Sequence, residues 1–329
     1  MSEAMLGGVL HAFHIPLTGL FINGSSVLFI SLIGYYSENR REILKATLIV
    51  LLIKAGVSPY TPPAAYFAVS IQGLLGEILF RPKKFFYIST VIFGTITLTL
   101  SSMQKIFLLT LVYGTDLWES LNRFGNYISE QFFFLGKIDN VSFIMIGFYI
   151  GFHMLSGFII GIMASNLPGW IRETHIEINM EKISKIQNSG YKNRKKKRKR
   201  KLWIQRPSGI LILVLAVVIV ILTYIFPYFS KTAGFRAIVM IVRSIIIMSI
   251  WFFFISPWFV KFYKKFFKGK ENKYSKEVSS AISLLPLFRA IVVYNWRISG
   301  GIFFLKRVKQ FIVNTFIYIL FADIKEEKK

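Results

Sequence analysis

Residues 141–165 read VSFIMIGFYIGFHMLSGFIIGIMAS, a run of 25 residues without Asp, Glu, Lys or Arg. About 20 apolar residues are enough for an α-helix to cross the hydrocarbon core of a bilayer. The run also carries Gly147, Gly151, Gly157 and Gly161, which form two pairs at GxxxG spacing. This spacing lets two membrane helices approach closely. The stretch therefore predicts a transmembrane helix with a tightly packed face.

Apolar runs of this kind recur along the whole chain. Hydrophobic residues make up 54% of the 329 residues and charged residues 17%, with a mean hydropathy of +0.53. A soluble domain carries more charge and shorter apolar runs. We therefore expect an all-α, polytopic integral membrane helical bundle of about eight to nine spans. The candidate spans are 5–22, 27–36, 44–57, 64–80, 85–112, 141–165, 210–229, 235–260 and 281–305.

Polar residues, Pro and Gly mark the expected ends of two spans. Asn23-Gly24-Ser25-Ser26 predicts a tight turn between the first two apolar runs. Pro168-Gly169-Trp170 predicts the end of the sixth span at a membrane interface. In the span 235–260, Arg243 lies inside an apolar stretch, so we expect it to snorkel or to face protein.

The distribution of charge predicts the orientation. Of the 41 Lys and Arg residues, 12 lie within 182–206, where there is no acid, and the turns at 37–45 and 81–84 are also basic. Basic loops stay on the cytoplasmic side. We expect a multi-pass protein of the bacterial inner membrane, with the N-terminus and the loop 171–207 in the cytoplasm and the net acidic segment 113–140 outside.

The chain divides into three parts by this pattern. We expect a six-span module at 1–170, a basic cytoplasmic linker at 171–207 and a second membrane module at 208–329. The linker contains 194–201, eight consecutive basic residues, which we expect to attract anionic lipid headgroups. Nucleic acid is not an expected partner, because no aromatic platform or recognised fold surrounds the run.

Motifs for covalent or nucleotide chemistry are missing from the sequence. There is no cysteine, which excludes thiol catalysis and thiolate metal sites. No Walker, HExxH or GxSxG motif occurs either. We therefore expect no catalytic residues and no cofactor in this chain, and we place a membrane-embedded enzyme last among its functions.

Three of the four histidines fall in predicted membrane segments: His11, His14 and His153. His11 and His14 share a helix face, and His153 could converge on them from the sixth span. Imidazole is a common ligand of transition metals, so these residues are candidates to bind a metal ion as substrate. The alternative is that each bonds a carbonyl or hydroxyl of a neighbouring helix.

Three further polar residues are candidates to bind substrate: Asn23, Tyr60 and Gln72. Tyr60 lies in Ser58-Pro59-Tyr60-Thr61-Pro62-Pro63, a loop that its prolines hold extended and that could close or line a cavity. Gln72 lies inside an apolar span, where polar side chains serve packing or binding.

The segment 281–309 is the candidate for coupling to a partner. It contains Arg289 and Arg297 and breaks at Gly300-Gly301. One interpretation is an interfacial helix that docks a soluble protein. The other is a ninth crossing with both arginines near its ends.

Two motifs resemble the membrane components of energy-coupling factor (ECF) transporters. His14-Ile15-Pro16 and the loop 58–62 are similar to motifs of the cobalt/nickel-type substrate-binding (S) components. Leu285-Pro286-Leu287-Phe288, with Trp296-Arg297-Ile298-Ser299-Gly300, is similar to a coupling helix of the transmembrane (T) component. The resemblance implies that His14 ligates a metal and that Arg297 docks into separate cytoplasmic ATPase subunits.

The sequence thus supports three hypotheses. The first is a membrane subunit of a small-nutrient uptake transporter, for a metal ion or a vitamin, which works with separate ATPase subunits and further membrane subunits. The second is a structural or assembly protein that anchors a larger complex through its basic loops. The third is a membrane-embedded enzyme.

Overall fold

The computed structural model describes residues 18–39, 41–57, 63–133, 140–174, 183, 233–258, 261–262, 265, 275–300 and 304–326. Within these ranges every regular element is a helix. This confirms the all-α class. The principal helices are α2 (Thr18–Tyr36), α3 (Glu42–Val57), α4 (Pro63–Leu79), α5 (Phe86–Tyr113), α6 (Asp116–Ile128), α7 (Val141–Glu173), α10 (Ala233–Ile250), α12 (Ser275–Ile298) and α13 (Phe304–Glu326).

Among the described residues, five helices are long and apolar enough to cross a membrane. They are Gly19–Tyr36, Lys83–Tyr113, Val141–Glu173, Ile238–Trp258 and Val278–Ile298, with Ala64–Leu79 as a shorter apolar helix. These helices indicate a membrane protein. The predicted span at 210–229 and most of the basic linker, including 194–201, lie outside the described residues, so the count of eight to nine spans in two modules stays a prediction.

The predicted turn at 23–26 is wrong, because α2 runs through it without a break. The Ser25 hydroxyl donates to the Phe21 carbonyl at 2.8 Å, and the Ser26 hydroxyl donates to the Ile22 carbonyl at 3.2 Å. Hydroxyls that bond within their own helix do not compete for a turn. The expected first two spans therefore share one helix over 18–36, and residues 1–17 lie outside the described part.

The predicted end of the sixth span at Pro168 is also wrong. Helix α7 includes Pro168 and continues to Glu173. Side chains bond to carbonyls on the preceding turn: Ser165 and Asn166 both donate to the Ile162 carbonyl, at 2.7 and 2.9 Å. Pro168 itself is buried. Membrane helices tolerate Pro where neighbouring helices and polar side chains support the backbone.

Helices α5 and α7 form the closest pair in the fold. A Cβ placed on Gly94 would lie 2.5 Å from the Gly157 carbonyl oxygen and 3.0 Å from the Cα of Gly161. The backbones touch here, as the GxxxG spacing predicts for Gly157 and Gly161. The other two glycines differ, since nothing lies within 4 Å of a Cβ on Gly147 or Gly151.

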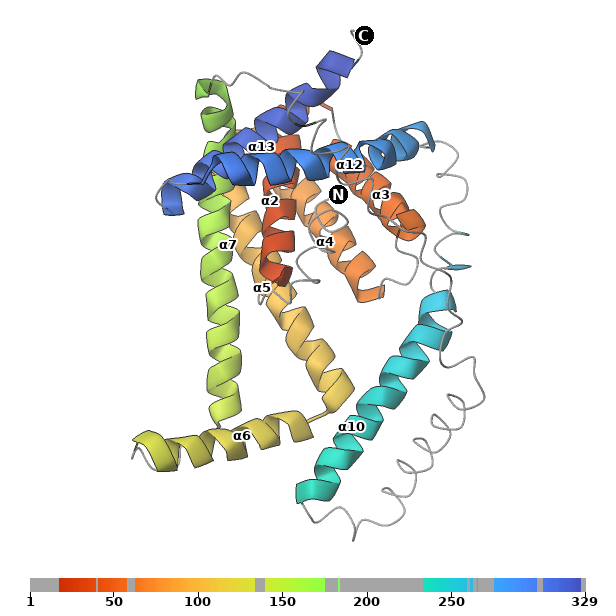
Figure 1. The fold of residues 1–329 in the computed structure, drawn as a ribbon, viewed down its shortest axis with the longest axis vertical. Helices are drawn as coiled ribbons and strands as arrows, with labels where there is room; N and C mark the ends of the chain where they lie inside the picture. The colour runs from red at the N-terminus through yellow and green to blue at the C-terminus, as the bar shows by residue number, and fades with distance from the viewer. Residues whose placement is uncertain are drawn as a thin grey trace.

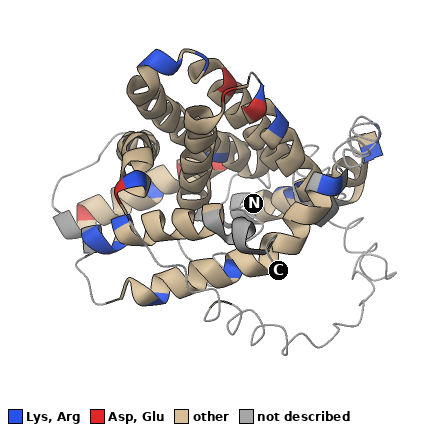
Figure 2. Ribbon diagram, turned by 90° about the horizontal axis from the view of Figure 1, so that it is seen from above, with Lys and Arg blue, Asp and Glu red and all other residues tan. Residues whose placement is uncertain are grey.

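The helices are arranged between two crosswise layers (Figure 1). Helix α6 lies across the far ends of α5 and α7, and α12 crosses α7 near the opposite end (Figure 1). The basic turns around Arg41, Lys83 and Arg172 lie at the ends of α2, α4 and α7, which are on the side of α12 and α13. Most of the helical surface carries no charge (Figure 2).

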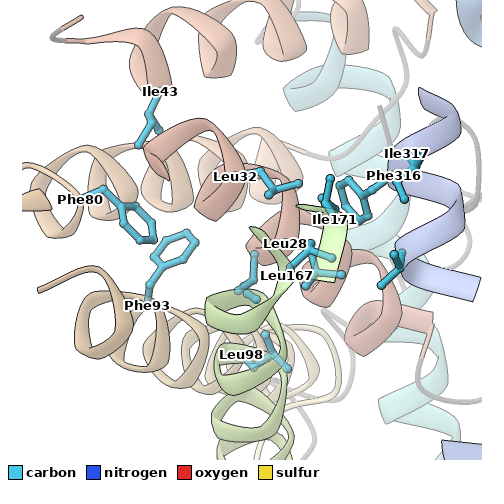
Figure 3. Packing of buried hydrophobic residues seen from close by; sticks show 13 residues of the cluster. Leu28, Leu32, Ile43, Phe80, Phe93, Leu98, Leu167, Ile171, Phe316 and Ile317 are labelled. Carbon is cyan, nitrogen blue, oxygen red and sulfur yellow. The ribbon is translucent and has the colours of Figure 1, made fainter. Parts of the chain in front are cut away.

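The hydrophobic core lies where α2 meets α4, α5, α7 and α13. Phe80 and Phe93 pack edge to face at 5.5 Å between ring centroids, and Leu28 and Leu167 fill the centre (Figure 3). Helix α13 contributes Phe316, whose ring lies 4.7 Å from that of Phe29. The second predicted module therefore packs directly on the first.

Helix α10 is attached to the corner between α5 and α6 by Arg243. Its guanidinium donates to the Tyr113 carbonyl and lies 3.1 Å from the Asp116 carboxylate. This confirms that Arg243 faces protein. A side chain larger than glycine does not fit at Gly114, because its Cβ would meet the same guanidinium. The φ of Gly114, 72°, also favours glycine at this position.

Candidate functional site

Three uncharged polar side chains meet inside the bundle. The Asn23 side-chain amide on α2 donates to the Ser101 hydroxyl on α5 at 2.6 Å. The Gln72 amide on α4 donates to the Asn23 side-chain oxygen at 2.8 Å. We call Asn23, Gln72 and Ser101 the polar cluster. It joins three helices through side chains alone.

The polar cluster lies among apolar neighbours, so its hydrogen bonds constrain how the three helices pack. Gln72 is 6% exposed. An amide removed from water without a partner is costly, so the two hydrogen bonds fix the relative positions of α2, α4 and α5. Two of these residues, Asn23 and Gln72, were predicted as site residues, and the structure brings them into contact.

A cavity of about 350 Å³ lies beside the cluster, between α4 and α5. We call it the α4–α5 cavity. Among the described residues its walls are mostly apolar, with Phe67, Ile71 and Phe107, and include no Asp, Glu, Lys or Arg. Its four polar lining residues are Gln72, Thr97, Ser101 and Gln104. A few polar groups in an apolar wall are typical of small-molecule pockets.

The polar groups that line the α4–α5 cavity differ in whether they already have a hydrogen-bond partner. The Gln104 amide donates to the Ala64 carbonyl at 2.8 Å, and Ser101 accepts from Asn23. The Thr97 hydroxyl is buried and has no hydrogen-bond partner, in a residue that is 3% exposed. A buried polar group without a partner calls for an explanation, and Thr97 is one of several such groups among the described residues, with Thr99 close by on α5.

Sequence reasoning missed Thr97, Ser101 and Gln104. They follow one another at i, i+4 and i+7 on α5, so they share a helix face. That spacing of polar residues in an apolar span was the signal available. It becomes informative only when the position of Gln72 on another helix is known.

His153 lies apart from the α4–α5 cavity and does not line it. It is 3% exposed, its Nδ1 lies 3.0 Å from the Tyr149 carbonyl, and its ring packs on the Tyr149 ring at 4.2 Å between centroids. The carbonyl belongs to α7 itself, one turn before His153, whereas the alternative expected a bond to a neighbouring helix. His11, His14 and Tyr60 lie outside the described residues, so the metal site stays a prediction. The described residues contain no group of three or more His, Cys, Asp or Glu side chains that could hold a metal.

The predicted coupling residues lie on the crosswise helix. Arg289 and Arg297 are exposed on α12, and Gly300 follows its end, whereas Gly301 lies outside the described residues. Beside them, the Arg307 guanidinium of α13 lies over the Trp296 ring at 4.2 Å, and Lys309 lies over Trp170 of α7 at 4.4 Å. These cation–π contacts hold α13 against α12 and α7.

Comparison with protein-family models, curated proteins and solved structures gave no match.

Proposed function

We propose that this chain is the substrate-binding membrane subunit of an uptake transporter for a small, uncharged organic nutrient. The observation that supports this most directly is the α4–α5 cavity, with its apolar walls and the unpartnered Thr97 hydroxyl beside the polar cluster. Its volume of about 350 Å³ suits a small molecule.

The charge of the ligand follows from the lining. No Asp, Glu, Lys or Arg from the part of the chain that the structure describes lines the α4–α5 cavity. A charged ligand there would lose its hydration without gaining a counter-charge, whereas a neutral one can bond to amides and hydroxyls. A vitamin-like molecule therefore fits this cavity better than a bare metal ion. The metal alternative depends on His11 and His14.

Energy for uptake would come from separate subunits. The sequence has no nucleotide-binding motif, and α12 offers exposed Arg289 and Arg297 on the basic side of the bundle. A crosswise helix with exposed arginines suits docking to cytoplasmic ATPase subunits. Replacing Arg297 with Glu should then abolish ATPase co-purification, and unchanged co-purification would refute the coupling role.

Binding can be tested without knowing the nutrient. The full chain, purified in detergent from cells, should carry a small organic molecule that mass spectrometry detects after denaturation. Gln72→Leu and Thr97→Val should each lose it, because they remove hydrogen-bonding groups from the cavity wall. Ser156→Ala is the matched control, since its hydroxyl bonds only the Phe152 carbonyl at 2.8 Å on α7.

Two results would overturn this proposal. One is a parent protein that carries no organic molecule when purified from cells in rich medium. The other is full retention of the molecule in both cavity variants. Silent cavity variants, together with loss of a complex on deletion of 182–206, would favour the alternative of a structural anchor.

A further inference from the structure

A second cavity, of about 430 Å³, lies on the other side of the polar cluster. It is a partly open space bordered by α2, α3 and α4 of the bundle and by α12 and α13, and we call it the α12–α13 cavity. Gln72 lines this cavity as well as the α4–α5 cavity.

The wall of the α12–α13 cavity is mainly apolar. Its hydroxyls on the bundle side are occupied within their own helices: Ser25 and Ser26 as described above, and Thr47 by donating to the Ile43 carbonyl at 2.7 Å. Gln72 is bonded to Asn23. These groups are satisfied and have little to offer a polar ligand. The remaining bundle-side lining is aliphatic or aromatic.

One polar group on the wall has no partner. The Thr315 hydroxyl of α13 is buried without a hydrogen bond, in a residue that is 8% exposed and lines the cavity. Phe288, Phe311 and Phe316 lie around the same part of the lining. The cavity therefore suits a long apolar ligand that carries a single hydrogen-bond acceptor.

We propose that the α12–α13 cavity holds an acyl chain of a membrane phospholipid, with the Thr315 hydroxyl donating to its ester carbonyl. The bounding helices include candidate membrane spans, so lipid is the solvent of this bundle. An acyl chain is flexible enough to follow a wall built from five helices. It also supplies the one acceptor that Thr315 lacks.

This lipid has a structural consequence for the hairpin of α12 and α13. Phe288 and Val292 of α12 and Ile312 and Thr315 of α13 line the cavity opposite the bundle. A bound chain would add protein–lipid contact to the direct packing of α13 on α2, where the Phe316 ring lies 4.7 Å from that of Phe29. The lipid would thus strengthen the attachment of α12 and α13 to α2 and α3, independently of any substrate in the α4–α5 cavity.

The test compares lipid retention in the full chain with that of a cavity-filling variant. Val50→Phe adds a ring to the α12–α13 cavity wall, and Leu74→Phe adds a ring at a position that is 52% exposed. Each protein is purified in dodecyl maltoside, given dioleoyl phosphatidylglycerol, passed through fresh detergent and weighed by native mass spectrometry. Thermal unfolding is recorded with and without the added lipid.

The parent and Leu74→Phe should keep one phospholipid and unfold at a higher temperature when lipid is added. Val50→Phe should lose the retained phospholipid and the lipid-dependent rise in unfolding temperature. Thr315→Val, which keeps the shape and removes the hydroxyl, should retain less lipid than the parent. A smaller filling variant, Ala46→Leu, gives the same comparison if Val50→Phe does not fold.

Equal lipid retention in the parent and in the filling variants would overturn the proposal. So would retention of free oleate, added in a parallel sample, in place of the phospholipid. A non-lipid molecule displaced by the filling variants would assign the cavity to another ligand. None of these outcomes bears on loss of nutrient from Thr97→Val, because Thr97 lines the α4–α5 cavity and not the α12–α13 cavity, so this inference and the proposed transport function can fail separately.

Discussion

Replacing Gly94 with Ala should destabilise the protein by forcing α5 and α7 apart. The new Cβ would lie 2.5 Å from the Gly157 carbonyl oxygen and 3.0 Å from the backbone nitrogen of Gly161. These are backbone atoms, which cannot rotate away as a side chain can. The contact relaxes only if the whole helix pair separates.

The size of the separation sets the cost. Ordinary contact begins near 3.4 Å, so the helices must part by about 0.9 Å, the difference between 2.5 and 3.4 Å. A gap of roughly 0.5–1 Å already forfeits a quarter to a half of the dispersion energy between facing atoms. Overpacking of this kind costs about 1–3 kcal/mol. We expect a loss near the upper end, because α5 and α7 share a long interface.

Thermal unfolding in detergent measures this loss. A change of 1 kcal/mol lowers the unfolding midpoint by roughly 2–4 °C in a domain of moderate size. Gly151→Ala is the matched control, since nothing lies within 4 Å of a Cβ there. It should leave the midpoint unchanged or raise it, because Ala is the better helix former.

The double variant Gly94→Ala with Gly161→Ala sharpens the test. A Cβ on Gly161 would lie 2.7 Å from the Cα of Val91, on the same seam. One separation of the helices relieves both contacts, so the double variant should lose less stability than the two single variants lose together. Equal unfolding midpoints for Gly94→Ala and Gly151→Ala would refute the reasoning.

Three further predictions concern the far end of the bundle. Arg243→Gln should lower the free energy of unfolding by about 1.5–3 kcal/mol, because hydrogen bonds to charged groups contribute that much and the Asp116 carboxylate loses the guanidinium. Thermal unfolding should show the loss, and an unchanged unfolding midpoint would contradict it. Trp118→Phe should cost about 1 kcal/mol in the same assay, since the indole N–H donates to the Thr110 hydroxyl at 3.0 Å. Phe124→Glu on α6, where Phe124 is 61% exposed, should leave the protein in the membrane fraction, because five other helices are long and apolar enough to span, but should lower its unfolding midpoint in liposomes by weakening contact of α6 with lipid, whereas Phe124→Trp should not.

The sequence predicted well those helices whose ends are set by charge or proline. The run 44–57 became α3 at Glu42–Val57, and the run 85–112 became α5 at Phe86–Tyr113. Lys, Arg, Glu and Pro flank these runs, so the apolar stretch and the helix end at nearly the same residues. The GxxxG spacing likewise predicted a close contact, although only Gly157 and Gly161 take part in it.

The errors came from polar residues inside apolar runs. Asn23, Ser25 and Ser26 predict a turn in the sequence, but in α2 the serines bond carbonyls of the preceding turn and Asn23 bonds across to other helices. In water such residues end helices, whereas within a bundle the lack of water keeps them helical. The partner of an intramembrane polar residue depends on tertiary packing, which a single sequence does not contain.

The polar segment after α5 illustrates a second limit. Its charges predicted an outward-facing connection, and the structure forms α6 there, lying across the ends of α5 and α7 (Figure 1). Leu117, Leu121 and Phe124 recur at helical spacing and could have revealed it. Net charge predicts the side of the membrane, whereas periodicity is needed to find a helix that lies along its surface.

Gln72 stands in the walls of both cavities, and its hydrogen bond to Asn23 holds it there. A change at this one side chain therefore alters the lining of both spaces at once. A variant of Gln72 cannot by itself assign a ligand to either space, whereas Thr97 lines only the α4–α5 cavity of the two and Val50 only the α12–α13 cavity. The bond that aligns α2 with α4 thus also links the chemistry of two binding spaces that lie on different faces of α4.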